Sequence, residues 1–301
     1  MRITLTGATG FLGARLVSEL AAAGHELSIL GRHQGSALPP AARFTTWDST
    51  GDEPPPESLV GAEAVINLAG EPVARRWNEE VKRRIRSSRV DGTRNLVRAI
   101  SRTSPPPKVL VNASAIGYYG SRGDEILTED SRPGRDFLAD LTKDWETEAD
   151  GAAQFGVRVV KLRIGIVLGN KGGALAQMLL PFRLGLGGRL ASGEQWMSWI
   201  HLDDAVGLIL FALGNEAVRG PLNTTAPNPV RNREFTEELG AVLHRPTIFP
   251  VPAVGIRALF GETAGVILAS QRVLPKVAEE RGYQFQFVRL RAALENILSA
   301  A

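Results

Sequence analysis

The chain has 301 residues, of which 44% are hydrophobic and 22% charged, a balance typical of a folded protein that buries a large core. That balance excludes a disordered or collagen-like chain. Lys and Arg number 35 against 32 Asp and Glu, a net charge of +3, which is too small to indicate a nucleic-acid partner by itself. The chain has no cysteine, so disulfides, thiolate nucleophiles and cysteine-based metal sites are excluded.

Metal and membrane partners are not expected either. The four histidines, His25, His33, His201 and His244, are scattered without a short metal-ligand spacing, so we predict no metal site. No apolar stretch approaches the ~18 residues that span a bilayer, and the N-terminus lacks the pattern of a signal peptide. We therefore expect a cytoplasmic protein without a membrane partner.

The first half of the sequence alternates short apolar runs rich in β-branched residues with longer helical patterns. Strands are predicted at 2–6, 26–30, 64–68, 108–113 and 157–167, and helices at 12–23, 78–102 and 138–155. Near-continuous apolar strands separated by helices form a parallel sheet covered on both faces, because parallel strands need crossover connections. The fold class is therefore predicted as α/β, with a doubly wound parallel sheet.

Beyond Gly169 the pattern loosens into glycine-rich stretches and then returns to predicted helices at 204–213 and 290–298. This pattern favours two interleaved parts over two tandem domains. The first domain is predicted at 1–170, completed by about 198–226. The smaller C-terminal lobe lies within 171–301 and is made of about 171–197 plus 227–301.

The strongest motif is the glycine-rich turn at residues 6–13, which follows the first strand and opens the first helix. Gly7 permits a tight turn, Gly10 lets the backbone approach a pyrophosphate, and Gly13 lets the helix pack closely on the strand. The free N–H groups of the helix N-terminus favour an anion there. The turn therefore predicts a dinucleotide site, with contacts from Gly7, Thr9, Gly10, Phe11, Leu12 and Gly13.

The end of the second strand indicates which dinucleotide is bound. An acidic residue there would bind the adenosine ribose of NAD, but this chain has Gly31, Arg32 and His33. A guanidinium matches a phosphate with paired, charge-assisted hydrogen bonds, so Arg32 suits the 2′-phosphate of NADP(H), and His33 is expected to assist. The alternative is that Arg32 only ends a strand in solvent.

Several motifs resemble the extended short-chain dehydrogenase/reductase superfamily: residues 6–13, 67–70, 92–96 and 201–204. Residues 114–120, 143–146 and 270–275 more narrowly resemble an atypical subgroup of the NAD-dependent epimerase/dehydratase family, the SulA-like proteins, with their C-terminal domain of unknown function. The resemblance implies a Rossmann domain that binds NADP(H) through Asn67, Ala69, Gly70 and Lys143 in addition to the turn. The resemblance does not identify a substrate, and we expect an unidentified small molecule in a cleft between the Rossmann domain and the smaller substrate lobe.

In active members of that superfamily a Tyr-x-x-x-Lys pair carries out the proton chemistry. Residues four apart share one helix face, so both side chains reach the same point above the cofactor. Lys143 fits the lysine by position, but Ala139 stands four residues earlier. The usual tyrosine is therefore absent, and standard carbonyl or alcohol chemistry would need another acid.

The resemblance places Ser114 where the superfamily serine orients the substrate, and Tyr119 where a tyrosine lines the substrate site. A phenol with a pKa near ~10 needs a neighbouring cation to act at neutral pH, and Lys143 is the candidate. We therefore predict Ser114, Tyr119 and Lys143 as catalytic residues. The alternatives are that Ser114 is a turn hydroxyl and that Tyr118 and Tyr119 pack a corner.

Other polar residues favour structural roles. Arg163 lies between apolar residues and is expected to point outward or to be paired. Asp203 and Asp204 are expected to cap a helix that starts at Ala205, and His201 to be structural unless it is an acid or base. The ten basic and three acidic side chains of residues 75–102 indicate a solvated helix face, so no nucleic-acid partner is expected.

These residues together predict an NADP(H)-dependent oxidoreductase or epimerase-like enzyme acting on an unidentified small molecule. The alternative is a non-catalytic NADP(H)-binding regulator or sensor, in which Ala139 marks lost chemistry. The sequence predicts no oligomeric state.

Overall fold

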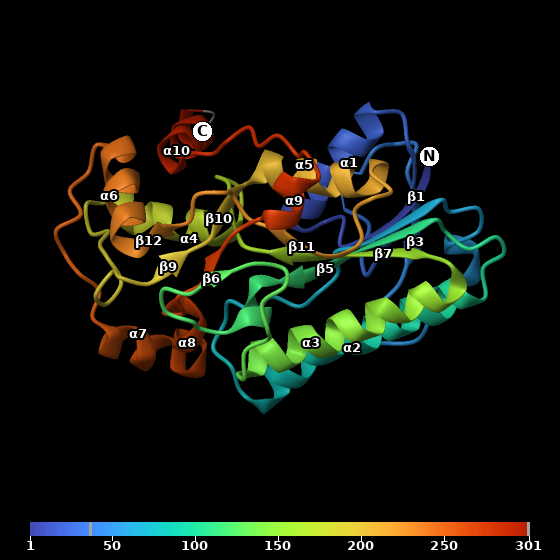
Figure 1. The fold of residues 1–301 in the computed structure, drawn as a ribbon, viewed down its shortest axis with the longest axis horizontal. Helices are drawn as coiled ribbons and strands as arrows, with labels where there is room; N and C mark the ends of the chain where they lie inside the picture. The colour runs from blue at the N-terminus through green and yellow to red at the C-terminus, as the bar shows by residue number, and fades with distance from the viewer. Residues whose placement is uncertain (36–37, 300–301) are drawn as a thin grey trace.

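The computed structural model describes residues 1–35 and 38–299 and contains a seven-stranded sheet in the order β11-β7-β5-β4-β1-β2-β3 (Figure 1). Every neighbouring pair in this sheet is parallel. The strands are β1 (Arg2–Thr6), β2 (Glu26–Gly31), β3 (Arg43–Thr46), β4 (Ala64–Asn67), β5 (Val109–Ala115), β7 (Arg158–Ile164) and β11 (Gly220–Thr224). The strand order reverses between β1 and β4, and ligands of such sheets bind beyond the carboxyl ends at that point.

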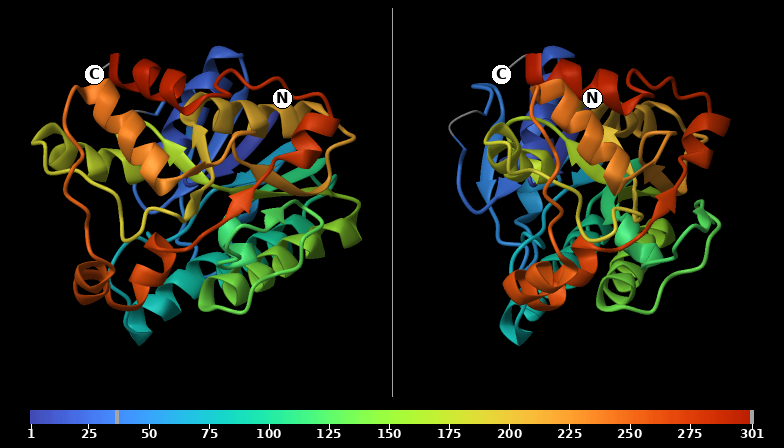
Figure 2. Two further views of the ribbon diagram at one scale, coloured as in Figure 1. Left: turned by 60° about the vertical axis from the view of Figure 1, so that its left-hand side comes forward. Right: turned by 90° about the vertical axis from the view of Figure 1, so that its left-hand side faces the viewer.

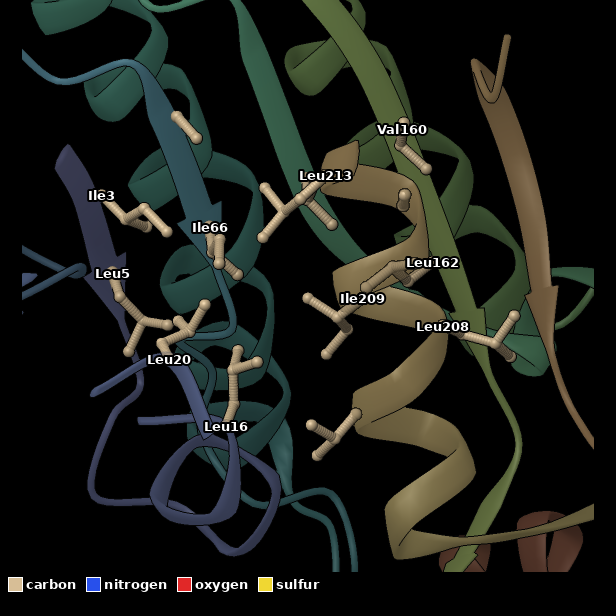
Figure 3. Close-up of a cluster of buried hydrophobic side chains, with 14 of the residues drawn as sticks. Ile3, Leu5, Leu16, Leu20, Ile66, Val160, Leu162, Leu208, Ile209 and Leu213 are labelled. Atoms are coloured by element: carbon tan, nitrogen blue, oxygen red, sulfur yellow. The ribbon is translucent and has the colours of Figure 1, made fainter. Parts of the chain in front are cut away.

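Helices cover both faces of the sheet. On one face lie α1 (Phe11–Ala22) and α5 (Leu202–Gly214), and on the other lie α2 (Glu79–Ser101) and α3 (Phe137–Asp150), which run side by side (Figures 1 and 2). Leu16 and Leu20 of α1 and Ile209 of α5 belong to the apolar core between these two helices and the sheet (Figure 3). Each such side chain contributes roughly 1.5–3 kcal/mol when fully buried.

The C-terminal helices gather at the end of the molecule away from the N-terminus (Figure 1). They are α4 (Gly173–Arg183), α6 (Asn232–Leu243), α7 (Ala253–Phe260), α8 (Ala264–Ile267) and α10 (Leu290–Ser299), whereas α9 (Lys276–Glu280) packs on the main core beside β11. A second apolar core, which includes Leu175, Trp199, Phe235 and Leu294, joins α4, α6 and α10. No helix within the described part of the chain is both long and apolar enough to cross a membrane.

Short strand pairs connect this region to the sheet. Parallel pairs join β8 (Ile166–Leu168) to β10 (Trp199–His201) and β6 (Ile126–Leu127) to β13 (Arg272–Val273), and an antiparallel pair joins β9 (Trp196–Met197) to β12 (Val230–Arg231). Short 3₁₀ turns cover Pro56–Ser58, Ile116–Tyr119, Gly151–Phe155 and Gly261–Thr263. The β6–β13 pair ties the tail of the chain to the loop that follows β5.

The predicted doubly wound α/β class is confirmed, while several element boundaries differ. The segment 157–167 is not one strand, because the chain breaks at Gly165 into β7 and β8. A Cβ atom at Gly165 would lie 2.5 Å from the Ser198 carbonyl oxygen, so the backbone passes too close for a side chain. The edge strands β3 and β11 were not predicted.

The prediction that Asp203 and Asp204 cap a helix starting at Ala205 is wrong. Helix α5 begins at Leu202, and the His201 side chain caps it by accepting a hydrogen bond from the Asp203 N–H at 3.0 Å. The carboxylate of Asp204 is fully buried and instead accepts hydrogen bonds from the backbone N–H groups of Gln286 and Phe287, at 2.8 and 2.9 Å. Asp204 therefore holds the C-terminal tail on α5.

Candidate functional site

The glycine-rich turn joins β1 to α1 at the point where the strand order reverses. Gly7 has a φ of +73°, and a Cβ atom there would lie 2.6 Å from the Leu68 carbonyl carbon. A Cβ atom at Gly13 would overlap the Gly7 carbonyl oxygen. Gly10 precedes the first helical residue and offers no side chain to cap α1. The first N–H groups of α1 are therefore left for an anion, and this cradle fits a dinucleotide pyrophosphate.

Phe11 links this turn to the start of the C-terminal region. Cβ atoms at Gly169 and Gly172 would lie 2.5 and 2.8 Å from atoms of the Phe11 ring. Leu12 packs against the main core, and Thr9 is exposed. The predicted cofactor residues of the turn thus lie together, with Phe11 filling the space that these two glycines leave open.

Asn67, predicted as a cofactor contact, has its side chain engaged within the protein. Its Oδ1 accepts from the Thr6 hydroxyl at 2.6 Å, and its Nδ2 donates to Asn112 Oδ1 at 2.7 Å and to Thr93 Oγ1 at 3.0 Å. These bonds fix the ends of three neighbouring strands. Ala69 and Gly70 follow β4, and the Ala69 N–H donates to the Thr6 hydroxyl at 3.1 Å.

Arg32 lies directly after β2 and is paired with a carboxylate. Its Nη1 donates to Glu71 Oε1 at 2.9 Å, Arg84 Nη2 lies 3.5 Å from the same oxygen, and Arg75 Nη2 lies 3.3 Å from Oε2. The Glu71 side chain is only 8% exposed, whereas that of Arg32 is 54% exposed. Sequence reasoning missed Glu71 and Arg84. The His33 side chain is exposed.

A shallow hollow surrounds this arginine group and also includes Asp48 and Thr50. The Asp48 carboxylate accepts from the Thr50 N–H and hydroxyl, at 2.9 and 2.8 Å, and these bonds, with nearby guanidinium groups, lower the pKa of Asp48. Both carboxylates of the hollow are thus held by donors of the protein. The exposed guanidinium of Arg32 has the geometry and charge to bind a phosphate at the end of β2.

A second polar cluster lies beyond the ends of β5 and β7. Arg163 makes a two-pronged ion pair with Glu146, with Nε to Oε1 at 2.8 Å and Nη2 to Oε2 at 2.9 Å. Both side chains are nearly buried, with exposed fractions of 4% and 6%. The Arg163 guanidinium also lies 3.5 Å from the centre of the Tyr118 ring. Arg163 is therefore buried and paired, which is one of its two predicted states.

Ser114 and Tyr119 belong to this cluster. The Ser114 hydroxyl donates to Glu146 Oε1 at 2.6 Å, and the Tyr119 hydroxyl donates to Asn223 Oδ1 at 2.6 Å while accepting from Arg163 at 3.0 Å. Burial raises the pKa of Tyr119 to about 12, although Arg163 opposes the shift. The phenol is therefore protonated at neutral pH and is held by partners within the protein.

The structure does not bring Lys143 to Ser114 or Tyr119. The Lys143 side chain is 53% exposed, and its Nζ lies 3.5 Å from Asp140. The residue of α3 that reaches Ser114 is Glu146, which sequence reasoning did not assign to the site. Ala139 is buried, and its methyl side chain supplies neither a phenol nor a cation to the cluster. A catalytic role for Lys143 stays a prediction.

The C-terminal segment 270–275 holds the loop that carries Tyr118 and Tyr119. Gln271 Nε2 donates to the carbonyl oxygens of Ile116 and Gly120, at 2.8 and 3.1 Å. The Ser198 hydroxyl donates to the Gln271 carbonyl oxygen at 2.7 Å and accepts from the Val273 N–H at 2.9 Å. The motif singled out in the sequence thus fixes the geometry of the second cluster.

Within residues 1–35 and 38–299, no group of three or more His, Asp or Glu side chains is placed to hold a metal ion. The arrangement combines a glycine cradle at the start of α1, an arginine at the end of β2, and a buried polar cluster at the carboxyl ends of β5 and β7.

Comparisons with known proteins agree with this architecture. A model of the NAD dependent epimerase/dehydratase family matches residues 3–223, and a model of a domain of unknown function, DUF1731, matches residues 251–297. The chain is 43% identical to the chloroplastic epimerase family protein SDR39U1 homolog of Arabidopsis thaliana, across 99% of this chain and 87% of that protein. It is 39% identical to the epimerase family protein YfhF of Bacillus subtilis, across 99% and 98%.

Among solved structures, the chain resembles a crystal structure of human epimerase family protein SDR39U1 (isoform 2) with NADPH. The TM-score is 0.89, the identity is 37%, and both chains are covered completely. The similarity therefore includes the C-terminal region as well as the sheet.

Proposed function

Because the chain belongs to the NAD dependent epimerase/dehydratase family, we propose that it is an NADP(H)-dependent oxidoreductase or epimerase-like enzyme acting on a small molecule. The observation that carries the proposal is the glycine cradle at the N-terminus of α1, combined with Arg32 at the end of β2. The NADPH in the structure of the human relative supports the choice of cofactor.

The roles of the residues follow from their positions. The N–H groups at the start of α1 bind the pyrophosphate, while Arg32 and Arg84 bind the 2′-phosphate, with Glu71 holding both guanidinium groups in place. When bound, the cofactor would supply a hydride donor or acceptor through its nicotinamide. Ala69 and Gly70 contact the cofactor through their backbone.

The cofactor proposal is tested by Arg32→Ala. The variant should weaken NADPH binding by about 1.5–3 kcal/mol, the value of a hydrogen bond to a charged group, while NADH binding is nearly unchanged. The measurement is a fluorescence titration with each cofactor, and Arg98→Ala on the outer part of α2 is the control. Equal losses for NADPH and NADH would show that Arg32 does not bind the 2′-phosphate.

For catalysis we propose Ser114, Tyr119 and Lys143. If Tyr119 is the acid or base, Tyr119→Phe should lower turnover roughly 10²-fold with NADPH affinity unchanged. If Lys143 binds the nicotinamide ribose, Lys143→Ala should weaken NADPH binding as well. Full turnover in Tyr119→Phe would assign the phenol to its contacts with Arg163 and Asn223.

A second function, NADP(H) binding without turnover, is favoured by three observations. Ala139 stands in place of the usual phenol, Lys143 is exposed, and Tyr119 has a raised pKa among partners of the protein itself. An assay of NADPH oxidation separates the two functions. The absorbance of NADPH is monitored in the presence of a panel of carbonyl compounds and nucleotide sugars. Turnover of any member establishes the enzyme. Tight NADPH binding without any turnover supports a regulator or sensor.

A further inference from the structure

Arg89 is the arginine of α2 that is partly buried without an ion pair within the described residues, since Arg83 and Arg98 also lack one but are exposed. Arg86 and Arg94 of α2, and Arg102 just after it, each have a carboxylate oxygen within 2.5–2.8 Å. Among the described residues, the guanidinium of Arg89 has no carboxylate within ion-pair distance. Its one hydrogen bond within the protein runs from Nη1 to the Ile85 carbonyl oxygen of its own helix, at 3.2 Å.

The Arg89 guanidinium lies at the carboxyl end of β4, beside the cofactor turn. A Cβ atom at Gly70 would lie 3.0 Å from its central carbon. Gly70 closely follows Leu68, whose carbonyl group packs directly against Gly7. On its other side the guanidinium lies 5.2 Å from the centre of the Trp145 ring. Arg89 thus reaches the crevice from α2, through the space that Gly70 leaves open.

This position holds an unsatisfied positive charge. Burial lowers the pKa of Arg89 to about 10, and Glu71 opposes this shift only from a distance. The group remains charged at neutral pH, and a partly buried charge without a counter-ion is unfavourable. The remaining N–H groups of the guanidinium keep contact with solvent and are available to a ligand. An anion bound beside Gly70 would relieve this cost.

We propose that Arg89 is a cofactor-binding residue whose guanidinium binds the pyrophosphate of the dinucleotide, opposite the N-terminus of α1. This inference rests on the proposed binding of NADP(H). Two sources of positive charge then surround the pyrophosphate, the helix N-terminus on one side and Arg89 on the other. Gly70 is needed because a side chain there would push the guanidinium out of the crevice.

The test compares NADPH with adenosine 2′-phosphate, which shares the 2′-phosphate but lacks the pyrophosphate and the nicotinamide riboside attached to it. Arg89→Gln in the full chain should weaken NADPH binding at least ~10-fold and leave adenosine 2′-phosphate binding unchanged. Arg32→Ala should weaken both ligands. Arg86→Gln, an exposed arginine on the same helix, is the matched control and should change neither.

Two further variants guard against a general loss of structure. Arg89→Lys keeps the charge and should recover part of the NADPH affinity, and Gly70→Ala should weaken NADPH while adenosine 2′-phosphate still binds. Wild-type NADPH affinity in Arg89→Gln would overturn the inference, as would a parallel loss of both ligands. Failure of the wild-type chain to bind either ligand would instead overturn the proposed function.

Discussion

The Glu146–Arg163 pair gives the sharpest stability prediction. Glu146→Ala removes two of the four hydrogen bonds made by the Arg163 guanidinium and leaves that charge 4% exposed, with only the Tyr119 hydroxyl and the Glu129 carbonyl oxygen as partners. Breaking one half of a buried ion pair costs about 3–5 kcal/mol. At roughly 2 °C per kcal/mol for a chain of this size, the melting temperature should fall by about 6–10 °C.

Chemical unfolding of the variants measures the loss of unfolding free energy. Glu148→Ala is the matched control, because Glu148 lies two residues further along α3 and its pair with Arg94 is more exposed. That variant should lose no more than about 1 kcal/mol. The double variant Glu146→Ala with Arg163→Met should lie closer to the wild type than Glu146→Ala alone. The reasoning is refuted if Glu146→Ala behaves like the control or if the double variant simply adds the two single losses.

Three other predictions concern the turn and the tail. Gly13→Ala places a methyl group against the Gly7 carbonyl oxygen of the turn. The variant should lose about 1–3 kcal/mol of unfolding free energy, measured in urea, and should bind NADPH more weakly. Gly255→Ala, with open space around it, should be close to neutral. Asp204→Ala leaves two backbone N–H groups of the tail without partners. It should lower the unfolding free energy by about 2–3 kcal/mol and speed proteolysis before α10. Equally fast cleavage in Asp203→Ala, a change at a more exposed carboxylate, would contradict the role of Asp204 in holding the tail. Burial lowers the pKa of His201 below its ordinary 6.5, so the stability given by the neutral ring is present above that value and is lost as pH falls through the folded pKa. His201→Asn keeps the helix cap and should flatten the fall in melting temperature between about pH 7.5 and 5.5, and an unchanged fall would assign the acid loss to another group.

The sequence predicts the sheet well where the chain alternates long patterns. Strands β1, β2, β4, β5 and β7 and helices α1, α2 and α3 come from apolar runs and helical periods that tertiary structure does not override. The two edge strands of the sheet were missed for different reasons. β3 is short and only partly buried, and β11 begins with Gly220 and Pro221, which is a turn signal in any local analysis.

The cofactor turn was predicted because its chemistry is local, whereas the Glu146–Arg163 pair of the second cluster was not. Glu146 and Arg163 come from different elements and meet only in the folded chain, so no spacing rule joins them. Lys143 matches the superfamily lysine by its position in the sequence. Because each step of one residue along a helix rotates the side-chain direction by about 100°, such a match does not fix which face of α3 the side chain occupies. Arg89 belongs to a basic stretch, and only the fold separates it from Arg83 and Arg98, because it is partly buried while they are exposed.

The attachment of the C-terminal segment has a consequence for synthesis of the protein. The strands from β1 to β7 leave the ribosome early, but Ser198, Asn223 and Glu129 all bind backbone groups of residues 271–277. Until that segment emerges, the buried carboxylate of Glu129 lacks its bond from Val277, and the loop bearing the two tyrosines lacks its bonds from Gln271. A chain that ends before residue 271 can therefore form the sheet without completing the layer above it.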